Sequence, residues 1–487
     1  MRRGLLPRLQ DFLFVLVLIG VITTGSRMLN IDSDLGRHLA MGGYILSSWR
    51  VPTTDILSFT RFGASRPPYE WLAQVLLAAS YRAINLDGVV LLAAAIIAAA
   101  FSVVQADAVR RSGGPLLSLF IALWAALASS LHWLPRPHVF TFLFLALWLY
   151  RLESLRRGVR NSIWLFPALM LMWANTHGGF IFGFLALGCY LAGWFVDAMR
   201  GATNRSLGAR MLAITGMCLI ASVITPDLWH NWDAVLNNRS SYVLSQTIET
   251  MPLRLATANV WPFLGMLAAA VALVAVRRFR VPPAHLILLA VLAAASFVMV
   301  RNIPLFCIAA VPLLADWAAP FLRLVPIWAR LEERFASIEA TTRPHIWTTI
   351  AMILAITCLA VRFSFTRAPL FQFRQDIFPV QAADWARTHR PQGAMFNDFN
   401  WGGYLLYRLW PQQRVFIDSQ SDFYGEQLTR EAASIANGDP GWEELLDRYD
   451  VQWLLLPGNA GLVRVALSDP RWSVAYQDGT AIIFTRK

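Results

Sequence analysis

The feature that most constrains this sequence is a series of long apolar blocks, which recur from about residue 12 to residue 363. Each is about 17–25 residues long, the length of a helix that crosses the roughly 30 Å hydrocarbon core of a bilayer. Only 15% of the 487 residues are charged, against about 25% in an average soluble domain. Because a charge in hydrocarbon costs several kcal/mol, the sequence predicts a polytopic membrane protein.

About eleven spanning helices are predicted. They lie near 12–29, 86–108, 115–132, 138–152, 162–176, 179–198, 211–225, 259–276, 284–300, 304–320 and 346–363. No small-residue cleavage site follows the first, so we expect it to be retained. The Arg-rich linkers all fall on one side of this arrangement, which the positive-inside rule makes the cytoplasm, together with the N-terminus. Residues 1–363 are therefore expected to form the transmembrane part, with a first external loop at 30–85, and residues 364–487 an extracytoplasmic domain.

The charge distribution and the cysteine content argue against a nucleic-acid-binding protein and against a disulfide-stabilised fold. The formal net charge is +12, but the arginines lie mostly between apolar blocks, as the positive-inside rule explains. We therefore expect no nucleic-acid partner. The four cysteines lie inside apolar blocks without metal-ligand spacing, which predicts buried thiols and no disulfide framework.

Outside the apolar blocks the sequence predicts folded segments. In the first external loop, 34–49 and 69–84 have helical apolar spacing and are expected to lie on the membrane surface. In the tail, short strands at 394–399 and 414–419 flank a helical segment, and a hairpin turn is predicted at Asp478-Gly479. Alternating strands and helices predict a small α/β domain with a mostly parallel sheet.

An acidic pair follows the first apolar block. Asp32 and Asp34 are two residues apart, and His38 comes one helical turn after Asp34. A carboxylate here could be a general base on an acceptor hydroxyl, or Asp32 and Asp34 could ligate a divalent metal such as Mg²⁺ or Mn²⁺. Alternatively, Asp32 or Ser33 caps the helix that starts near Leu35.

From these residues onward the sequence resembles the GT-C glycosyltransferase superfamily, and within it a group of bacterial membrane glycosyltransferases. The matching motifs run in order along nearly the whole chain: Asp34, His38-Leu39, Gly42, Pro52 with Asp55, Glu70-Trp71-Leu72, RPH at 136–138, NTHGGF at 175–180, Ile248-Glu249, RNIP at 301–304 and NDFNWGGY at 397–404. The chain departs from the group at Gly36 and Arg37, where an aromatic pair is common, and at Thr250, where Trp is common.

The resemblance implies an inverting transfer of a sugar from a polyprenyl-phosphate donor to an envelope glycan, lipid or protein acceptor outside a bacterial inner membrane. Asp34 or Asp32 would be the base. The basic residues of predicted external turns would hold the lipid phosphate, because arginine suits phosphate by its planar fork of donors. These donor-site candidates are Arg136, His138, Arg301, His177 and His38. Alternatively, the arginines snorkel to lipid headgroups.

Further substrate-site candidates are Asp55, Glu70, Glu249, Asp398 and Asp418. Asp398 and Asp418 follow predicted strands, where open α/β sheets bind ligands. The loop arginines Arg37, Arg50, Arg61 and Arg66 also need a reason to lie outside the cytoplasm, and anionic ligands are one candidate. The alternative to an enzyme is a non-catalytic transporter, lipid carrier or assembly factor in envelope polysaccharide export. A transporter tends to place charges at mid-bilayer depth, whereas the middles of the predicted spans here are nearly free of charge, Asp107 and Asp197 lie near cytoplasmic ends, and polar groups cluster at one interface.

Overall fold

The computed structural model describes residues 6–159, 162–202, 204–236, 242, 250–253, 260–277, 280–342 and 346–487. The chain divides into two compact units. Unit 1 comprises Met1–Thr23, Val90–Leu228 and Ile248–Phe365, and unit 2 comprises Thr24–Val89, Trp229–Thr247 and Thr366–Lys487. The whole first external loop, 30–85, therefore belongs to the same unit as the C-terminal tail. The predicted division at residue 364, which concerns the two sides of a membrane, stays a prediction.

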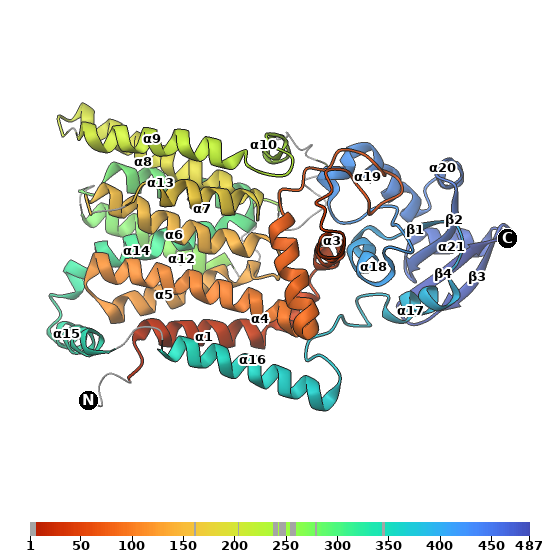
Figure 1. The fold of residues 1–487 in the computed structure, drawn as a ribbon, viewed down its shortest axis with the longest axis horizontal. Helices are drawn as coiled ribbons and strands as arrows, with labels where there is room; N and C mark the ends of the chain where they lie inside the picture. The colour runs from red at the N-terminus through yellow and green to blue at the C-terminus, as the bar shows by residue number, and fades with distance from the viewer. Residues whose placement is uncertain are drawn as a thin grey trace. The chain divides into compact units, whose positions relative to one another are not determined.

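Unit 1 is a bundle of apolar helices (Figure 1). Its elements are α1 (Leu9–Thr23), the second part of α4 (Trp71–Ser112), α5 (Pro115–Ser129), η2 (Ser130–His132), α6 (His138–Arg156), α7 (Leu165–Ala174), η3 (Gly178–Phe180), α8 (Ile181–Met199), α9 (Arg205–Ser222), α12 (Trp261–Val276), α13 (Pro283–Val298), η6 (Val300–Asn302), α14 (Ile303–Leu322), α15 (Pro326–Thr341) and α16 (Ile346–Thr366). Each of the eleven predicted apolar segments coincides with one of these helices. The chain is a multi-pass membrane protein.

The length of these helices is uneven. Among the described residues, six helices are long and apolar enough to cross a membrane: Trp71–Ser112, Pro115–His132, His138–Arg156, Gly178–Met199, Val300–Leu322 and Ile346–Thr366. Four apolar helices are shorter, namely α1, α7, α12 and α13. The number of eleven crossings therefore stays a prediction. The core helix is α14, which is buried along almost its whole length and packs against α5, α6, α12 and α13.

The charged groups of α4 and α6 meet at one end of unit 1. Arg111 pairs with Asp107 at 2.5 Å between Nη2 and Oδ2. Glu153 is fully buried and accepts hydrogen bonds from Arg156 and Arg157, and its Oε2 lies 2.9 Å from Nε2 of His285. These buried charges are compensated by pairing, as burial requires.

Unit 2 combines the first external loop with the C-terminal α/β domain. Its elements are α2 (Gly25–Leu29), α3 (Asp34–Ser48), the first part of α4, α10 (His230–Leu236), α17 (Val380–His389), β1 (Ala394–Asn397), η7 (Phe399–Trp401), α18 (Gly402–Leu409), α19 (Ser421–Asn437), α20 (Trp442–Arg448), β2 (Val451–Pro457), α21 (Gly461–Ser468), β3 (Trp472–Gln477) and β4 (Ala481–Arg486). The helix α4 bends at Ile84 and Asn85, whose backbone is not helical. The two predicted loop helices are thus α3 and the start of α4.

The sheet is mixed, so the prediction of a mostly parallel sheet was wrong. Its order is β1-β2-β4-β3, with β1 parallel to β2 and the other two pairs antiparallel. The predicted hairpin accounts for the antiparallel β3–β4 pair, and Oδ1 of Asp478 stabilises its turn by accepting hydrogen bonds from the backbone of Thr480 and Ala481, at 2.7 Å each. The segment 414–419 is not a strand of this sheet, because its Val415 forms only an isolated bridge with Ser58.

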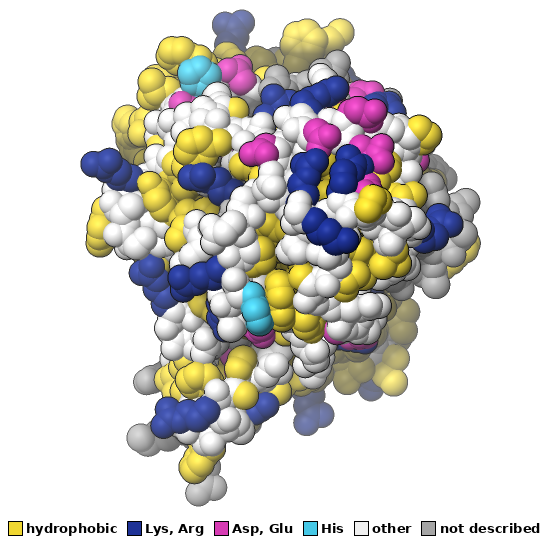
Figure 2. Space-filling view, turned by 90° about the vertical axis from the view of Figure 1, so that its right-hand side faces the viewer, with side chains coloured by type: hydrophobic (Ala, Val, Ile, Leu, Met, Phe, Trp, Pro, Cys, Tyr) yellow, Lys and Arg dark blue, Asp and Glu magenta, His cyan; other side chains and the backbone are white. Residues whose placement is uncertain are grey.

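Aromatic and aliphatic side chains of α19, α20, α21 and the strands form one hydrophobic core in unit 2. Phe416 and Ile417, from the segment predicted as a strand, belong to it. The face at the C-terminal domain carries basic side chains beside aspartate and glutamate, with hydrophobic side chains scattered between them (Figure 2).

Two glycines allow α3 and α18 to pack closely. A Cβ on Gly36 would lie 2.1 Å from the carbonyl oxygen of Gly403, and a Cβ on Gly403 would lie 2.2 Å from that of Ser33. Neither position has room for a larger residue. This explains why the aromatic residue that is common at the Gly36 position is replaced here, and it gives the glycines of NDFNWGGY a packing role.

We predict that Gly403→Ala destabilises unit 2 by about 1–3 kcal/mol, because the added methyl group overlaps a backbone carbonyl. The apparent unfolding temperature in detergent micelles should fall by several degrees. The matched control is Gly458→Ala, whose Cβ would meet no atom within 4 Å. Equal unfolding temperatures for the two variants would contradict the close helix contact.

Candidate functional site

Unit 2 gathers an arginine and its carboxylate partners around the start of α3. We call Asp34, Arg37, His38, Glu70 and Asp418 the Arg37 cluster. The guanidinium of Arg37 lies 3.9 Å from Oδ1 of Asp34, 3.8 Å from Oε2 of Glu70 and 3.9 Å from Oδ1 of Asp418. The side chain of Arg37 is 8% exposed and that of Asp418 is fully buried. The cluster joins the first external loop to the C-terminal domain within one unit.

The histidine of the cluster is oriented by its neighbours. Nε2 of His38 lies 3.5 Å from Nη2 of Arg37, and Nδ1 lies 3.3 Å from Nε2 of Gln74 and 3.8 Å from Oε2 of Glu70. A guanidinium and a side-chain amide nitrogen both only donate, so each ring nitrogen of His38 faces a donor, and the carboxylate of Glu70 lies beside Nδ1 as an acceptor.

A second arginine lies beside this cluster. Nη1 of Arg66 is 2.5 Å from Oδ1 of Asp55, and its Nη2 is 2.5 Å from Oε1 of Gln420 and 3.7 Å from Oδ2 of Asp418. Asp55 also accepts hydrogen bonds from the backbone of Leu57 and from Ser58. Asp55 is thus a structural anchor of the loop as well as a neighbour of Asp418.

The charge balance around both arginines keeps them protonated. Burial lowers the pKa of Arg37, but the charges of Asp34, Asp418 and Glu70 outweigh that effect and raise its pKa above the usual value. Burial also works against the charge on Arg66, and Asp418 and Asp55 raise its pKa in the same way. Both side chains are therefore cations at any physiological pH.

A small cavity adjoins the two arginines. It has a volume of about 30 Å³ and is lined by Arg37, Arg66, Tyr69, Glu70, Gln74 and Gln420 among others. That volume suits a water molecule, which needs polar partners of this kind. The ion-pair distances of Arg37, at 3.8–3.9 Å, are longer than direct hydrogen bonds and leave room for polar atoms of a ligand or water between the charges.

The two aspartates of the acidic pair have different surroundings. Oδ1 of Asp32 accepts a hydrogen bond from the backbone N–H of Asp34 at 2.9 Å, so Asp32 stabilises the first turn of α3. Asp34 accepts a hydrogen bond from the hydroxyl of Ser419 and faces Arg37. Of the pair, Asp34 is therefore the one that belongs to the Arg37 cluster.

The carboxylates and the histidine of the Arg37 cluster are not arranged like the ligands of a metal site. Within the described residues, no group of three His, Cys, Asp or Glu side chains is placed to hold a metal ion. The carboxylates of Asp34, Glu70 and Asp418 already surround a cation, the guanidinium of Arg37. A divalent ion at Asp32 and Asp34 stays a prediction without geometric support in this arrangement.

Asp398 has no hydrogen bond or ion pair to the Arg37 cluster among those described. Its Oδ1 caps η7 by accepting from the backbone N–H of Asn400 at 2.8 Å, and burial raises its pKa. Glu249 lies outside the described residues. Of the five further substrate-site candidates, Asp55, Glu70 and Asp418 come together.

Unit 1 gathers the predicted basic residues at turns between its helices. We call His132, Arg136, His138, His177 and Arg301 the basic cluster. The rings of His132 and His138 are 4.3 Å apart between centroids, and those of His138 and His177 are 6.4 Å apart. The charges of Arg136, Arg301 and His177 all act on His132. Four residues predicted from sequence are thus brought together, and His132 is the member that sequence reasoning missed.

The ring of His177 has a defined proton position. Its Nδ1 accepts from the backbone N–H of Gly179 at 3.0 Å and lies 2.8 Å from the hydroxyl of Thr141. That hydroxyl accepts from the indole of Trp173, so its proton points to His177. The proton of neutral His177 is therefore on Nε2.

The sequence signal for the missed residues of unit 2 was weak. Arg37 stood out as an arginine on the expected outer side, but its partners Gln74, Ser419 and Gln420 are ordinary polar residues. Only the fold places positions 419 and 420 beside residues 34 and 66.

Comparison with known proteins bears on the fold. Neither a protein-family model nor a curated protein matches the sequence. Among solved structures, the chain is similar to the archaeal oligosaccharyltransferase AglB from Archaeoglobus fulgidus in complex with an inhibitory peptide and a dolichol-phosphate, with a TM-score of 0.59 and 12% identity over 91% of this chain and 69% of that one. It is also similar to ArnT from Cupriavidus metallidurans in the apo state, with a TM-score of 0.53 and 14% identity over 97% of both chains.

Both of these proteins are membrane glycosyltransferases of the GT-C superfamily. The chain has the GT-C fold. A third GT-C structure, the Archaeoglobus fulgidus oligosaccharyltransferase with Zn and sulfate, matches with a TM-score of 0.58 and 12% identity over 98% of this chain and 73% of that one. That neighbour holds a divalent metal.

We predict that Arg37→Met destabilises the folded protein by about 3–5 kcal/mol at neutral pH, since it leaves buried carboxylates without their cation. In the variant the carboxyl groups acquire raised folded-state pKa values, so protonation favours folding. The difference in the free energy of unfolding between the wild type and the variant should therefore become smaller as the pH falls from 8 towards 5. Chemical unfolding in detergent at several pH values measures this.

The control for that experiment is Arg387→Met, which removes an exposed pair with Asp384 and should cost less than about 1 kcal/mol at every pH. A deficit of Arg37→Met that stays constant with pH would contradict the carboxylate environment.

Proposed function

We propose that this chain is a membrane glycosyltransferase that moves a sugar from a polyprenyl-phosphate donor to a hydroxyl of an envelope glycan, lipid or protein. The reaction would take place on the extracytoplasmic face of a bacterial inner membrane, with the N-terminus in the cytoplasm. The observation that carries the proposal is the position of Asp34 at the first turn of α3, oriented by Ser419 and Arg37, in a chain with the GT-C fold.

In this reaction Asp34 takes the proton of the acceptor hydroxyl. The acceptor oxygen forms a bond to the anomeric carbon of the sugar, and the bond from that carbon to the phosphate oxygen breaks. The electron pair leaves with the polyprenyl phosphate, and attack from the opposite face inverts the anomeric carbon. A base must lie within hydrogen-bond reach of the proton it accepts, and a side chain held by two neighbours is suited to that.

The Arg37 cluster supports Asp34 in this proposal. Arg37 fixes the carboxylate from the same helix, three residues on, while Glu70 and Asp418 hold Arg37 in turn. Asp32 acts through the backbone, because its hydrogen bond shapes the turn that presents Asp34. We therefore assign the base to Asp34 and a positioning role to Asp32.

The basic cluster of unit 1 is proposed to bind the lipid phosphate. Arg136 and Arg301 supply charge and planar donor sets, and His177 supplies the Nε2–H donor described above. Charge-assisted hydrogen bonds of this kind are roughly twice as strong as neutral ones. A leaving phosphate gains negative charge, so the same groups would stabilise it as the sugar leaves.

We predict that Asp34→Asn abolishes transfer while donor binding persists, because the amide keeps the shape but accepts no proton. The assay follows label release from radiolabelled polyprenyl-phosphate sugars by purified protein in nanodiscs, with added Mg²⁺ or Mn²⁺ or with EDTA. Asp32→Asn should retain part of the activity. The matched control is Asp376→Asn, an exposed residue paired only with Arg374 among the described residues, which should behave as wild type.

Full activity of Asp34→Asn would remove the base from this residue. Donor binding without label release from any sugar, in wild type as well, would instead favour a lipid carrier. Loss of activity in EDTA that added Mg²⁺ or Mn²⁺ restores would establish the metal requirement.

We predict that Arg136→Ala raises the KM for the donor by about tenfold or more, since a hydrogen bond to a charged group contributes about 1.5–3 kcal/mol. The control is Arg330→Ala, whose exposed side chain lies on α15 and should leave KM unchanged. If Arg136→Ala lowers kcat at constant KM, the residue does not belong to a donor phosphate site.

A further inference from the structure

A groove on the C-terminal domain lies outside everything assigned so far. It has a volume of about 810 Å³ and is formed by the end of α19, the start of α20, α21 and the start of β3. A volume of this size lies within the range of small-molecule sites, about 300–1,000 Å³. All of its residues belong to unit 2.

Two glycines shape the walls of the groove. Gly438 ends α19 in the left-handed conformation, with φ of 71°, which turns the chain away from the helix axis. A Cβ on Gly461 would lie 2.0 Å from the backbone oxygen of Asn437. The end of α19 and the start of α21 are therefore in direct backbone contact, which makes this wall rigid.

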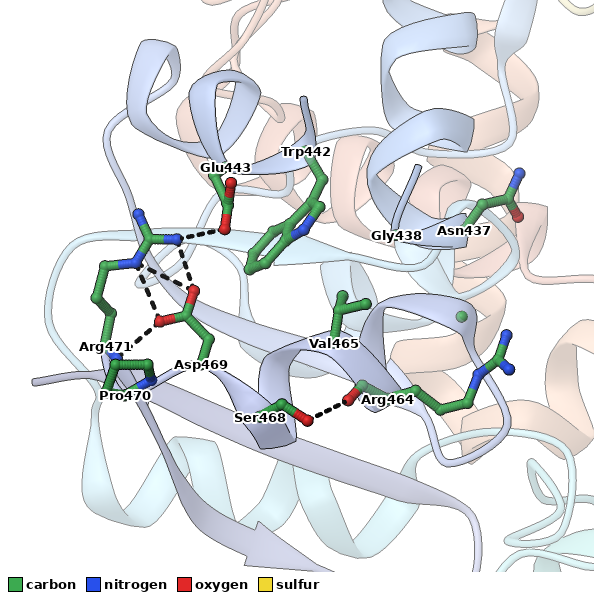
Figure 3. Close-up of a pocket in the computed structure, with 11 residues that line it drawn as sticks. Asn437, Gly438, Trp442, Glu443, Arg464, Val465, Ser468, Asp469, Pro470 and Arg471 are labelled. Carbon is green, nitrogen blue, oxygen red and sulfur yellow. Dashed lines mark hydrogen bonds and ion pairs between the residues drawn. The ribbon is translucent and has the colours of Figure 1, made fainter. Parts of the chain in front are cut away.

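One end of the groove holds two fixed carboxylates. Nη2 of Arg471 lies 2.6 Å from Oδ2 of Asp469 and 2.9 Å from Oε1 of Glu443 (Figure 3). Hydrogen bonds from Arg471 also lower the pKa of Asp469. These carboxylates are oriented acceptors that retain lone pairs for a ligand.

The other end holds polar groups that the protein itself does not use. Figure 3 shows Arg464 and Asn437 there, with Trp442 and Val465 between them and the carboxylates. The side chains of Asn437 and Arg464 are exposed. Within the described part of the chain, no group accepts from the guanidinium of Arg464 or pairs with the amide of Asn437.

The chemistry of the lining identifies the kind of ligand. Two arginines and two carboxylates give the groove no net charge, so it has no preference for an anion. It also carries too many polar groups for an apolar ligand. Sugar hydroxyls both donate and accept, and their C–H faces pack on apolar surface such as that of the half-buried Val465. A neutral saccharide matches fixed acceptors at one end, donors at the other and an apolar middle.

We propose that this groove binds a neutral oligosaccharide, as a docking site for the acceptor glycan. The proposal rests on the proposed transferase function, from which it takes the acceptor role. Among the three classes of acceptor left open there, it selects a glycan.

A second groove of unit 2 provides a contrast. It has a volume of about 760 Å³ and is lined by Arg387, Arg390 and Arg414, with no carboxylate in its lining. Its side chains are comparable in type and exposure, but their charge is of one sign. A substitution there controls for a general loss of surface arginine.

The test measures oligosaccharide binding directly, with no lipid donor present. The full chain in nanodiscs is titrated calorimetrically with maltotriose, cellotriose, mannotriose and chitotriose, and with inorganic phosphate. At least one trisaccharide should bind. Arg464→Ala should weaken its Kd about tenfold and Asn437→Ala about threefold or more, as expected for lost hydrogen bonds, whereas Arg390→Ala should leave Kd unchanged.

Several outcomes would overturn the proposal: no trisaccharide binds, binding is insensitive to both groove substitutions, or phosphate binds in the groove instead. Failure here is distinguishable from failure of the transferase proposal. Label release that depends on Asp34 without trisaccharide binding would reject only the groove, and binding without label release would reject only the enzyme.

Discussion

Unit 2 depends on the burial of one guanidinium among carboxylates from distant parts of the chain. Arg37 lies between Asp34 of its own helix, Glu70 before α4 and Asp418 of the C-terminal domain. A buried ion pair contributes little net stability, because desolvation offsets the attraction, but breaking it is costly. The main effect of the cluster is therefore to make the packing within unit 2 specific, rather than to add stability. It fixes which surface of the first external loop meets the C-terminal domain, and so it fixes the orientation of Asp34.

The glycine contact between α3 and α18 works together with this cluster. Electrostatic attraction at 3.8–3.9 Å requires the two backbones to approach closely, and Gly36 and Gly403 provide that approach. Gly36 and Arg37 stand where the group of glycosyltransferases that the sequence resembles commonly has an aromatic pair. One departure removes bulk where α18 packs, and the neighbouring one adds the charge that Asp418 and Glu70 compensate. The departures thus have one structural cause.

The sequence predicted those parts of the structure that depend on local pattern. The apolar blocks predicted the helices of unit 1, and helical spacing predicted α3, the start of α4 and α18. Asp478-Gly479 predicted the hairpin. The segment 414–419 was predicted wrongly because a short apolar run has the same pattern whether it pairs in a sheet or only fills a core, as Phe416 and Ile417 do. Four of the five basic-cluster residues were predicted because each sits in a polar motif between apolar blocks. The contacts of Ser419 and Gln420 depend on residues more than 350 positions away, which no local pattern encodes.

The distribution of charge along α6 helps to distinguish a transporter from an enzyme that acts at the membrane surface. The helix begins at His138, in the basic cluster, and its last turns carry Glu153 in a compensated network of arginines and His285. Glu153 comes fifteen positions after His138, or about 22 Å along the helix, and none of the residues between His138 and Tyr150 is charged. A transporter needs polar groups at mid-depth to receive its cargo. In α6 the middle is apolar and the polar groups lie at the two ends. The basic end can bind an anionic ligand at the membrane surface, and the Glu153 network at the other end stabilises the helix packing. This arrangement favours catalysis at the membrane surface over passage through it.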